Sequence, residues 1–171
     1  MMIKVSELEE AGITVDDTAA IGVPFADASW QLDEVDLSVM PDGRDVLVRG
    51  RLSATVPQVC SRCLESFPAA VHPNVDVRLV PRPATGDSVE LGQDDLDVDF
   101  YSNDLLDLAA LIETETTLAL PMKPLCRTDC QGLCRTCGAN RNLVPCDCPS
   151  RAPDPRLAAL GRLAVRLHDT N

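Results

Sequence analysis

Residues 126–148 read CRTDCQGLCRTCGANRNLVPCDC and hold six of the eight cysteines in the chain. The other two lie in the segment VCSRCLE, and 62 residues separate the second of them from Cys126. The full set is Cys60, Cys63, Cys126, Cys130, Cys134, Cys137, Cys146 and Cys148. Eight thiols divide into two sets of four, which is the ligand count of two tetrahedral zinc sites. We therefore expect one or two structural Zn²⁺ ions, with all eight cysteines as candidate ligands.

The most specific part of this stretch is Cys134-Arg-Thr-Cys137-Gly138. In a Cys-x-x-Cys turn, successive backbone amides point at the sulfurs, and a following glycine permits a left-handed bend close to the metal. Catalytic zinc sites keep an open coordination position and commonly use a histidine or carboxylate ligand. An all-cysteine set therefore predicts a structural metal.

The cysteines form four sequence pairs, Cys60/Cys63, Cys126/Cys130, Cys134/Cys137 and Cys146/Cys148. Joining the third and fourth pairs closes a loop of eight residues, and its low closure entropy favours a local site. The first and second pairs then form the other site. The rival arrangement joins the second and third pairs, which only three residues separate, and leaves the first pair to meet the fourth. Spacing favours the first arrangement, and the rival stays open.

Other uses of the thiols are less favoured. Disulfides need an oxidising compartment, and the N-terminal sequence MMIKVSELEEAG has no apolar signal-peptide core. No run of 18 apolar residues offers a membrane span, so we expect a soluble, cytoplasmic protein. The spacings of ferredoxin iron–sulfur clusters are absent, and a redox pair at Cys60/Cys63 would not need six further thiols.

Charge is distributed unevenly along the chain. Residues 1–120 carry 7 basic and 23 acidic side chains, a net charge of −16, whereas residues 121–171 carry 8 and 4, a net charge of +4. An overall charge of −12 argues against a general nucleic-acid coat protein. The acidic body suits a basic protein as a partner.

Hydrophobic alternation predicts a sheet in the first hundred residues. Apolar residues alternate over 30–39 and 46–56, and Pro41-Asp-Gly43 supplies a turn between these two strands. Further strands are expected over residues 69–81 and 97–101. Residues 16–29 show no clear period and predict a loop or a partly extended segment.

Helical periodicity appears in three places. Ser6-x-x-Glu9 is a capping-box pattern for a short helix that ends near Gly12. Apolar residues spaced by three and four predict a helix over residues 105–119. Asp154-Pro155 begins an amphipathic helix within residues 151–171.

The predicted fold class is α+β: an antiparallel sheet or partly closed β-barrel with a covering helix, a C-terminal Cys-rich zinc module and a terminal helix. We expect an acidic body over residues 1–120, a zinc module over 121–150 that the upstream pair Cys60/Cys63 completes, and the terminal helix over 151–171.

Four stretches also match a known family pattern: VCSRCL at 59–64, LALP with PLC between 118 and 126, the run CQGLC…CG…N…N…C…C over 130–148, and DPRL at 154–157. Together they resemble the YceD family, the large ribosomal RNA subunit accumulation proteins of bacteria and plastids. The resemblance implies a non-enzymatic factor linked to accumulation of 23S ribosomal RNA. Its expected partners are ribosomal RNA or a large-subunit ribosomal protein or precursor, with no membrane and no small-molecule substrate.

Two alternatives stay open at this point. One is a zinc-dependent hydrolase or redox enzyme, although the chain has only two histidines, His72 and His168, and neither is near a cysteine pair in sequence. We expect no catalytic residues. The other is an acidic module that binds a basic ribosomal protein and not RNA.

Overall fold

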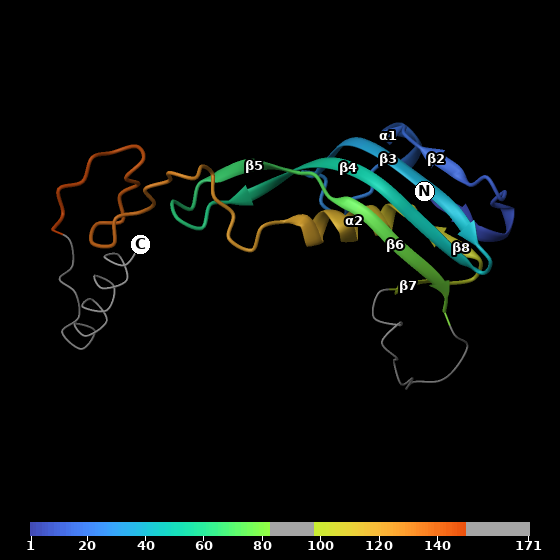
Figure 1. The fold of residues 1–171 in the computed structure, drawn as a ribbon. Helices are drawn as coiled ribbons and strands as arrows, with labels where there is room; N and C mark the ends of the chain where they lie inside the picture. Colours follow the sequence, from blue (N-terminus) through green and yellow to red (C-terminus); the bar gives the residue numbers. More distant parts are fainter. Residues whose placement is uncertain (83–97, 150–171) are drawn as a thin grey trace, which may run out of the picture. The chain divides into compact units, whose positions relative to one another are not determined.

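The computed structural model describes residues 1–82 and 98–149 of the chain (Figure 1). It divides into a sheet unit, Met1–Cys130, and a cysteine-rich unit, Gln131–Asn171. The boundary falls inside the segment 121–150 that the sequence groups as one zinc module. The helix expected within residues 151–171 lies outside the described residues.

One six-stranded sheet dominates the sheet unit. Its strands are β2 (Ile13–Val15), β3 (Gln31–Asp42), β4 (Asp45–Val59), β5 (Ser66–Val71), β6 (Asn74–Pro81) and β7 (Val98–Tyr101). Their order is β2-β3-β4-β6-β7, and β5 pairs with β4. The α+β class is confirmed. The sheet is open, and it is mixed because β7 runs parallel to β6.

The long hairpin of β3 and β4 is the centre of this sheet. The two strands pair from Gln31↔Thr55 to Asp42↔Asp45, and Gly43-Arg44 makes the turn. The predicted alternation is confirmed, because the apolar residues of both strands face one side and are buried. They are Val35, Leu37 and Val39 on β3, and Val46, Val48, Leu52, Ala54 and Val56 on β4.

The single strand predicted over residues 69–81 is wrong in detail, because it is two strands separated by His72-Pro73. Both strands pair with β4, and the register is continuous: Arg51↔Asn74 and Ala54↔Val71 leave two residues on each side between them. Proline has no N–H to donate to a ladder, which accounts for the interruption.

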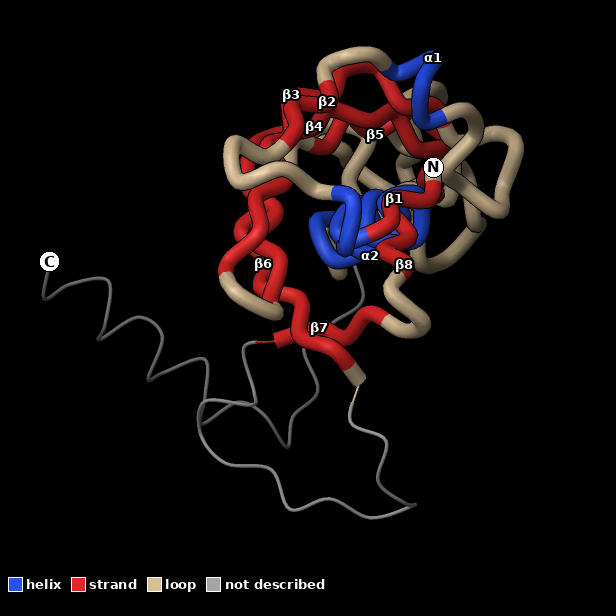
Figure 2. The backbone as a smooth tube through the Cα atoms, turned by 90° about the vertical axis from the view of Figure 1, so that its right-hand side faces the viewer, coloured by secondary structure: helices blue, strands red, loops and turns tan. Residues whose placement is uncertain are grey.

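Helix α2 (Leu108–Ala119) covers the apolar side of the sheet. Asp107 is its N-cap, and its Oδ1 accepts hydrogen bonds from the amides of Ala109 and Ala110. The predicted start at residue 105 is wrong, because β8 (Leu105–Asp107) instead pairs with β1 (Met2–Lys4). Figure 2 shows the sheet curving around α2, from β2, β3 and β4 through β6 to β7.

The core of the sheet unit lies between the sheet and α2. It contains 19 buried residues, among them Leu108, Leu111 and Ile112 of the helix. The core is made almost wholly of aliphatic side chains, with Phe25 its one buried aromatic residue in the described part of the chain. The sheet unit therefore has a hydrophobic core that needs no metal to define it.

The N-terminal segment differs most from prediction. The capping-box helix is absent; a 3₁₀ turn, η1 (Val5–Glu7), stands in its place. Ser6 makes its hydrogen bonds to the distant carboxylate of Asp104 and not to a helix terminus. A one-turn helix, α1 (Thr18–Ile21), lies within the predicted loop, and Asp17 caps it.

Candidate metal centres

Cys60, Cys63, Cys126 and Cys130 come together in the sheet unit, and their sulfur atoms all lie within 4.8 Å of one another. We call this group centre 1. Cys60 directly follows the end of β4, and the last two cysteines follow α2 in the chain. Cys60, Cys63 and Cys130 are buried, whereas Cys126 is half-buried. Centre 1 thus joins the C-terminal end of β4 to the segment that follows α2.

Main-chain hydrogen bonds shape the first half of centre 1. The amide of Cys60 donates to the Glu65 carbonyl at 2.9 Å, and the amide of Leu64 donates to the Cys60 carbonyl at 2.9 Å. Leu64 adopts a φ of 62° in this turn. The amide of Ser61 donates to the Pro124 carbonyl at 2.8 Å, which ties the turn to the segment carrying Cys126.

Arg62 holds the second half of centre 1. Its Nη1 donates to the carbonyl oxygen of Cys130 at 3.0 Å and to that of Thr128 at 3.4 Å. The guanidinium therefore stabilises the main chain between the two downstream ligands. In the sequence, Arg62 stands out only as the arginine of the motif VCSRCL, which assigns it no role.

Centre 2 lies in the cysteine-rich unit and consists of Cys134, Cys137, Cys146 and Cys148, whose sulfurs also lie within 4.8 Å of one another. The expected turn is present: the amide of Thr136 donates to Cys134 Sγ at 3.4 Å. Gly138 has the predicted left-handed conformation, with a φ of 74°. Its amide donates to the Cys134 carbonyl at 2.9 Å.

Two asparagines organise the loop between the halves of centre 2. Asn142 Oδ1 accepts a hydrogen bond from the Gln131 amide at 2.8 Å. Asn140 Oδ1 accepts from the amide of Asn142 at 3.0 Å. The amide of Arg141 donates to the Gly132 carbonyl at 3.0 Å. These bonds connect the start of the unit to the loop, so the return of the chain toward Cys146 does not depend on the sulfurs alone.

The sulfur separations fit a single tetrahedral ion. A zinc–sulfur bond of about 2.3 Å in tetrahedral geometry places neighbouring sulfurs roughly 3.8 Å apart. The observed distances are 3.8 Å for Cys60–Cys130 and 3.7 Å for Cys63–Cys126. In centre 2, the sulfurs of Cys137 and Cys146 are 3.5 Å apart.

These distances are too long for disulfide bonds, in which the two sulfurs lie about 2.05 Å apart. They are also short for a four-iron cluster, because each thiolate then binds a different iron and the sulfurs are held further apart. The donor set of both centres therefore fits one thiophilic ion in each.

Each centre contains thiols whose pKa values are shifted in opposite directions. Backbone hydrogen bonding from Cys126, then from Cys63, lowers the pKa of the Cys60 thiol to about 6. Burial raises the pKa of Cys126 to about 12. A bound cation would favour the thiolate form at all four sulfurs.

The same contrast holds in centre 2. Backbone hydrogen bonding from Cys137, then from Thr136, lowers the pKa of Cys134 to about 6. Side-chain hydrogen bonding with Cys146 raises the pKa of Cys148 to about 12. Each centre therefore has one thiol that loses its proton readily and at least one neighbouring thiol that would need a bound cation to lose its own.

All eight candidate cysteines are thus gathered, in the grouping that loop closure favours: first pair with second, and third pair with fourth. That these sulfurs ligate a metal stays a prediction. Arg62, Asn140 and Asn142 all lie in the motifs that carry the family resemblance, but residue spacing did not predict their contacts.

Within residues 1–82 and 98–149, no helix is long and apolar enough to cross a membrane. The fold and the two centres define an α+β protein with paired four-cysteine centres, one on the sheet unit and one in the cysteine-rich unit.

The chain belongs to the YceD family. The family model described as "Large ribosomal RNA subunit accumulation protein YceD" matches residues 48–164, a stretch that contains all eight cysteines.

Several curated proteins are similar to the chain. An uncharacterized protein of Mycobacterium leprae is 33% identical over 136 residues, which cover 77% of this chain and 60% of the relative. An uncharacterized protein of Mycobacterium tuberculosis is 35% identical over 128 residues, covering 73% of this chain and 59% of the relative. A large ribosomal RNA subunit accumulation protein YCED homolog 1, chloroplastic, from Arabidopsis thaliana is 25% identical over 157 residues, covering 78% and 49%. The chain therefore matches about half to three fifths of the length of these relatives. No solved structure matches it.

Proposed function

We propose that the protein is a non-enzymatic, zinc-stabilised cytoplasmic factor that supports accumulation of 23S ribosomal RNA and biogenesis of the large ribosomal subunit. The observation that carries this proposal is the family match over residues 48–164, which contains all eight cysteines. The plant relative, whose name refers to ribosomal RNA accumulation, supports the same role. The proposed partners are ribosomal RNA or a large-subunit ribosomal protein or precursor.

Zinc is the proposed occupant of both centres. Four thiolates complete a tetrahedral shell and leave no position for a substrate or an activated water. Bound zinc would act as a cross-link and supply no chemistry. In centre 1 it would join the C-terminal end of β4 to the segment after α2, and in centre 2 it would join the third cysteine pair to the fourth.

A binding role without turnover is supported by the arrangement of the groups that could act in catalysis. Ser53 and His72 line one groove of the sheet unit together with Glu34. A nucleophile needs a hydrogen bond to its base, and among the described residues no hydrogen bond joins Ser53 to His72. The thiols are engaged in the two centres.

The role in ribosomal RNA accumulation is tested in a strain that lacks the gene. We expect the ratio of 23S to 16S ribosomal RNA to fall in that strain and to recover when the wild-type gene is returned. An unchanged ratio in the deletion strain would overturn the proposed function. Affinity purification with and without ribonuclease then separates an RNA-dependent association from a direct protein contact.

Zinc is tested by elemental analysis of protein expressed without added metal, where we expect two zinc ions per chain. Iron accompanied by visible charge-transfer absorption, or titratable thiols without metal, would show that zinc is not the occupant of the two centres. Ribonuclease or phosphatase activity that co-purifies with the protein and is lost in Cys134→Ser would show that the non-enzymatic role is wrong.

A further inference from the structure

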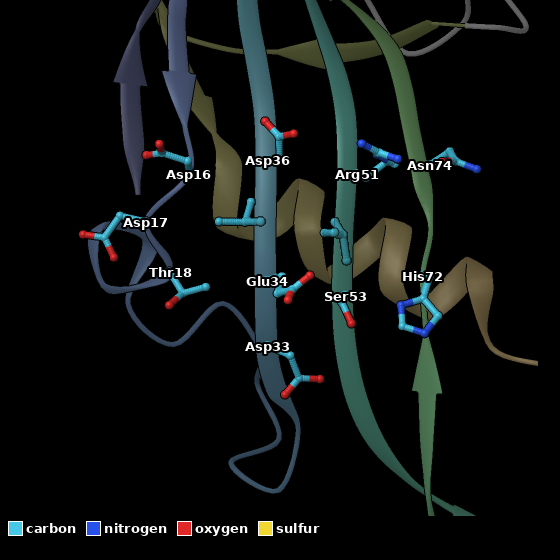
Figure 3. A pocket seen from close by; sticks show the side chains of 12 residues that line it. Asp16, Asp17, Thr18, Asp33, Glu34, Asp36, Arg51, Ser53, His72 and Asn74 are labelled. Carbon is cyan, nitrogen blue, oxygen red and sulfur yellow. The ribbon is translucent and has the colours of Figure 1, made fainter.

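The sheet face opposite α2 carries a groove. In Figure 3 the helix runs behind the sheet, and labelled side chains from β3, β4 and the β2–α1 segment project toward the viewer. The groove has a volume of about 660 Å³ and lies between that segment and the outer face of β3 and β4. No helix or strand among the described residues lies over it in this view.

The groove is strongly anionic. It is lined by five carboxylates, Asp16, Asp17, Asp33, Glu34 and Asp36, and by one arginine, Arg51, with His72 also in its lining. The carboxylates of Asp16, Glu34 and Asp36 make no hydrogen bond or ion pair with any described residue. Asp33 and Asp17 only accept hydrogen bonds, from Thr55 and from the Ala19 amide. These carboxylates therefore keep their negative charge available to a ligand.

Elsewhere on this face, carboxylates already neutralise the arginines. Arg49 Nε lies 2.8 Å from Asp76 Oδ1. Arg78 pairs with Asp45. These two arginines are therefore already paired, whereas the groove carboxylates have no basic partner within ion-pair distance in the described part of the chain.

The carboxylates are too far apart to chelate one ion. Among the described residues, the only groups of three or more potential ligand atoms within 4.8 Å of one another are the two cysteine centres. Glu34 and Asp36 occupy alternate positions of β3, and such positions lie roughly 6.6–6.8 Å apart along a strand. This spacing suits separate cationic side chains at alternate positions of an extended polypeptide.

The groove continues into an apolar hollow, which is a second and independent observation. This hollow has a volume of about 440 Å³ and shares Thr18 and Asp33 with the groove. Val23, Phe25 and Trp30 line it. Val23 is 78% exposed, and the rings of Phe25 and Trp30 pack with centroids 5.4 Å apart. A partly exposed aromatic residue beside an exposed aliphatic one is typical of the anchor position of a protein interface.

We infer that the acidic groove and the adjoining apolar hollow form one docking surface for an extended protein segment that carries lysine or arginine beside an apolar anchor residue. The inference rests on the proposed function, because ribosome assembly supplies basic protein segments of this kind. It names protein as the partner at this surface, since five carboxylates repel the phosphates of RNA.

The sole tryptophan of the chain, Trp30, allows a direct test. The full-length, metal-loaded protein is titrated with a 12-residue peptide that alternates lysine and serine around a central leucine. We expect a saturable change in tryptophan emission that weakens as salt is added. A peptide with glutamate in place of lysine, and a single-stranded RNA of 12 nucleotides, should leave the emission unchanged.

Paired variants separate this surface from net charge. Glu34→Gln with Asp36→Asn should weaken peptide binding about 2- to 30-fold, because two exposed charge pairs are lost. Glu9→Gln with Glu10→Gln removes the same charge at exposed positions that do not line the groove, and should change the affinity less than about twofold. Arg51→Gln should tighten binding of the basic peptide, since it removes a like charge. An anionic occupant would instead bind Arg51→Gln more weakly.

Three results would overturn the inference: no binding of the lysine peptide, equal weakening by the two double variants, or RNA binding that Arg51→Gln reduces. In cells, the groove double variant should fail to restore 23S ribosomal RNA in the deletion strain. Full restoration by that variant would show that the docking surface is not needed for 23S ribosomal RNA accumulation, and would leave the proposed function intact. A deletion strain with normal 23S ribosomal RNA would refute the proposed function. The peptide titration would still decide whether the docking surface binds basic segments.

Discussion

Replacing Cys137 by serine is expected to unfold the described part of the cysteine-rich unit, residues 131–149, while the sheet unit stays folded. Within residues 131–149 only Gly132 is buried, so no apolar side chain in that segment is fully shielded from water. The sheet unit, by contrast, has a core of 19 buried residues. Order in residues 131–149 therefore depends on centre 2 and on the hydrogen bonds around it.

The size of the effect follows from the metal. Structural zinc contributes about 10–16 kcal/mol in zinc-finger peptides. We take the loss of one ligand in four as a quarter of that range, about 2.5–4 kcal/mol, which corresponds to a roughly 60- to 700-fold larger equilibrium constant for opening of the site. This is a minimum if the three remaining thiolates release the ion altogether.

Amide hydrogen exchange measures this opening residue by residue. The amides of Cys134 and Gly138, which bond to Ala139 and Cys134 carbonyls, report on centre 2. The amide of Val48, in the middle of β4, reports on the sheet unit. Thr136→Ala serves as the matched control, because only the backbone amide of Thr136 contacts a ligand sulfur. Exchange that rises equally at Val48 and Cys134, or at neither, would refute the reasoning.

Three further substitutions test the sheet unit by denaturant unfolding. Arg62→Ala should cost about 1–2 kcal/mol, because a charged hydrogen bond to the Cys130 carbonyl is lost, and should speed the release of one zinc ion to a chelator; Arg62→Lys should cost less. Asp107→Ala removes the N-cap of α2 and should cost about 1 kcal/mol, whereas Asp107→Asn should be nearly neutral. Gly50→Ala should cost more than about 3 kcal/mol, because Gly50 has a φ of 148° and an added Cβ would clash with the Asp36 carbonyl oxygen. For Arg62→Ala, Asp107→Ala or Gly50→Ala, a stability within about 0.5 kcal/mol of the wild type, the range of neutral surface changes, would contradict the expectation.

The central hairpin could be predicted from the sequence because one face of it is buried, which forces apolar residues to alternate. The partner of each edge strand could not be predicted in this way. The parallel pairing of β6 with β7 joins strands whose own residues show no sign of direction. Strand β8 was missed because Leu105 and Leu106 continue the apolar pattern of the helix that follows. Its pairing with β1, about a hundred residues away, decides its conformation.

The cysteine groups could be predicted because residue type and local spacing restrict which sulfurs meet. The contacts of the residues that support them could not. Arg62 reaches the carbonyl of Cys130, and a main-chain acceptor 68 residues away leaves no trace in side-chain spacing. The groove was missed for a related reason: its carboxylates come from β3 and from the β2–α1 segment, which only the folded sheet brings side by side.

The two centres differ in how their ligands are brought together. Centre 1 closes a loop of 62 residues and centre 2 a loop of eight, so closing the longer loop costs about 1.8 kcal/mol more in an unfolded chain. In the folded protein that cost is offset before any metal binds, because β4 fixes Cys60 and the amide of Ser61 bonds to Pro124 beside the segment of Cys126. A metal bound at centre 1 would therefore cross-link a structure that the hydrophobic core of the sheet unit already defines. Centre 2 has no such core beneath it in residues 131–149, so there the binding of metal and the folding of the loop would be a single event.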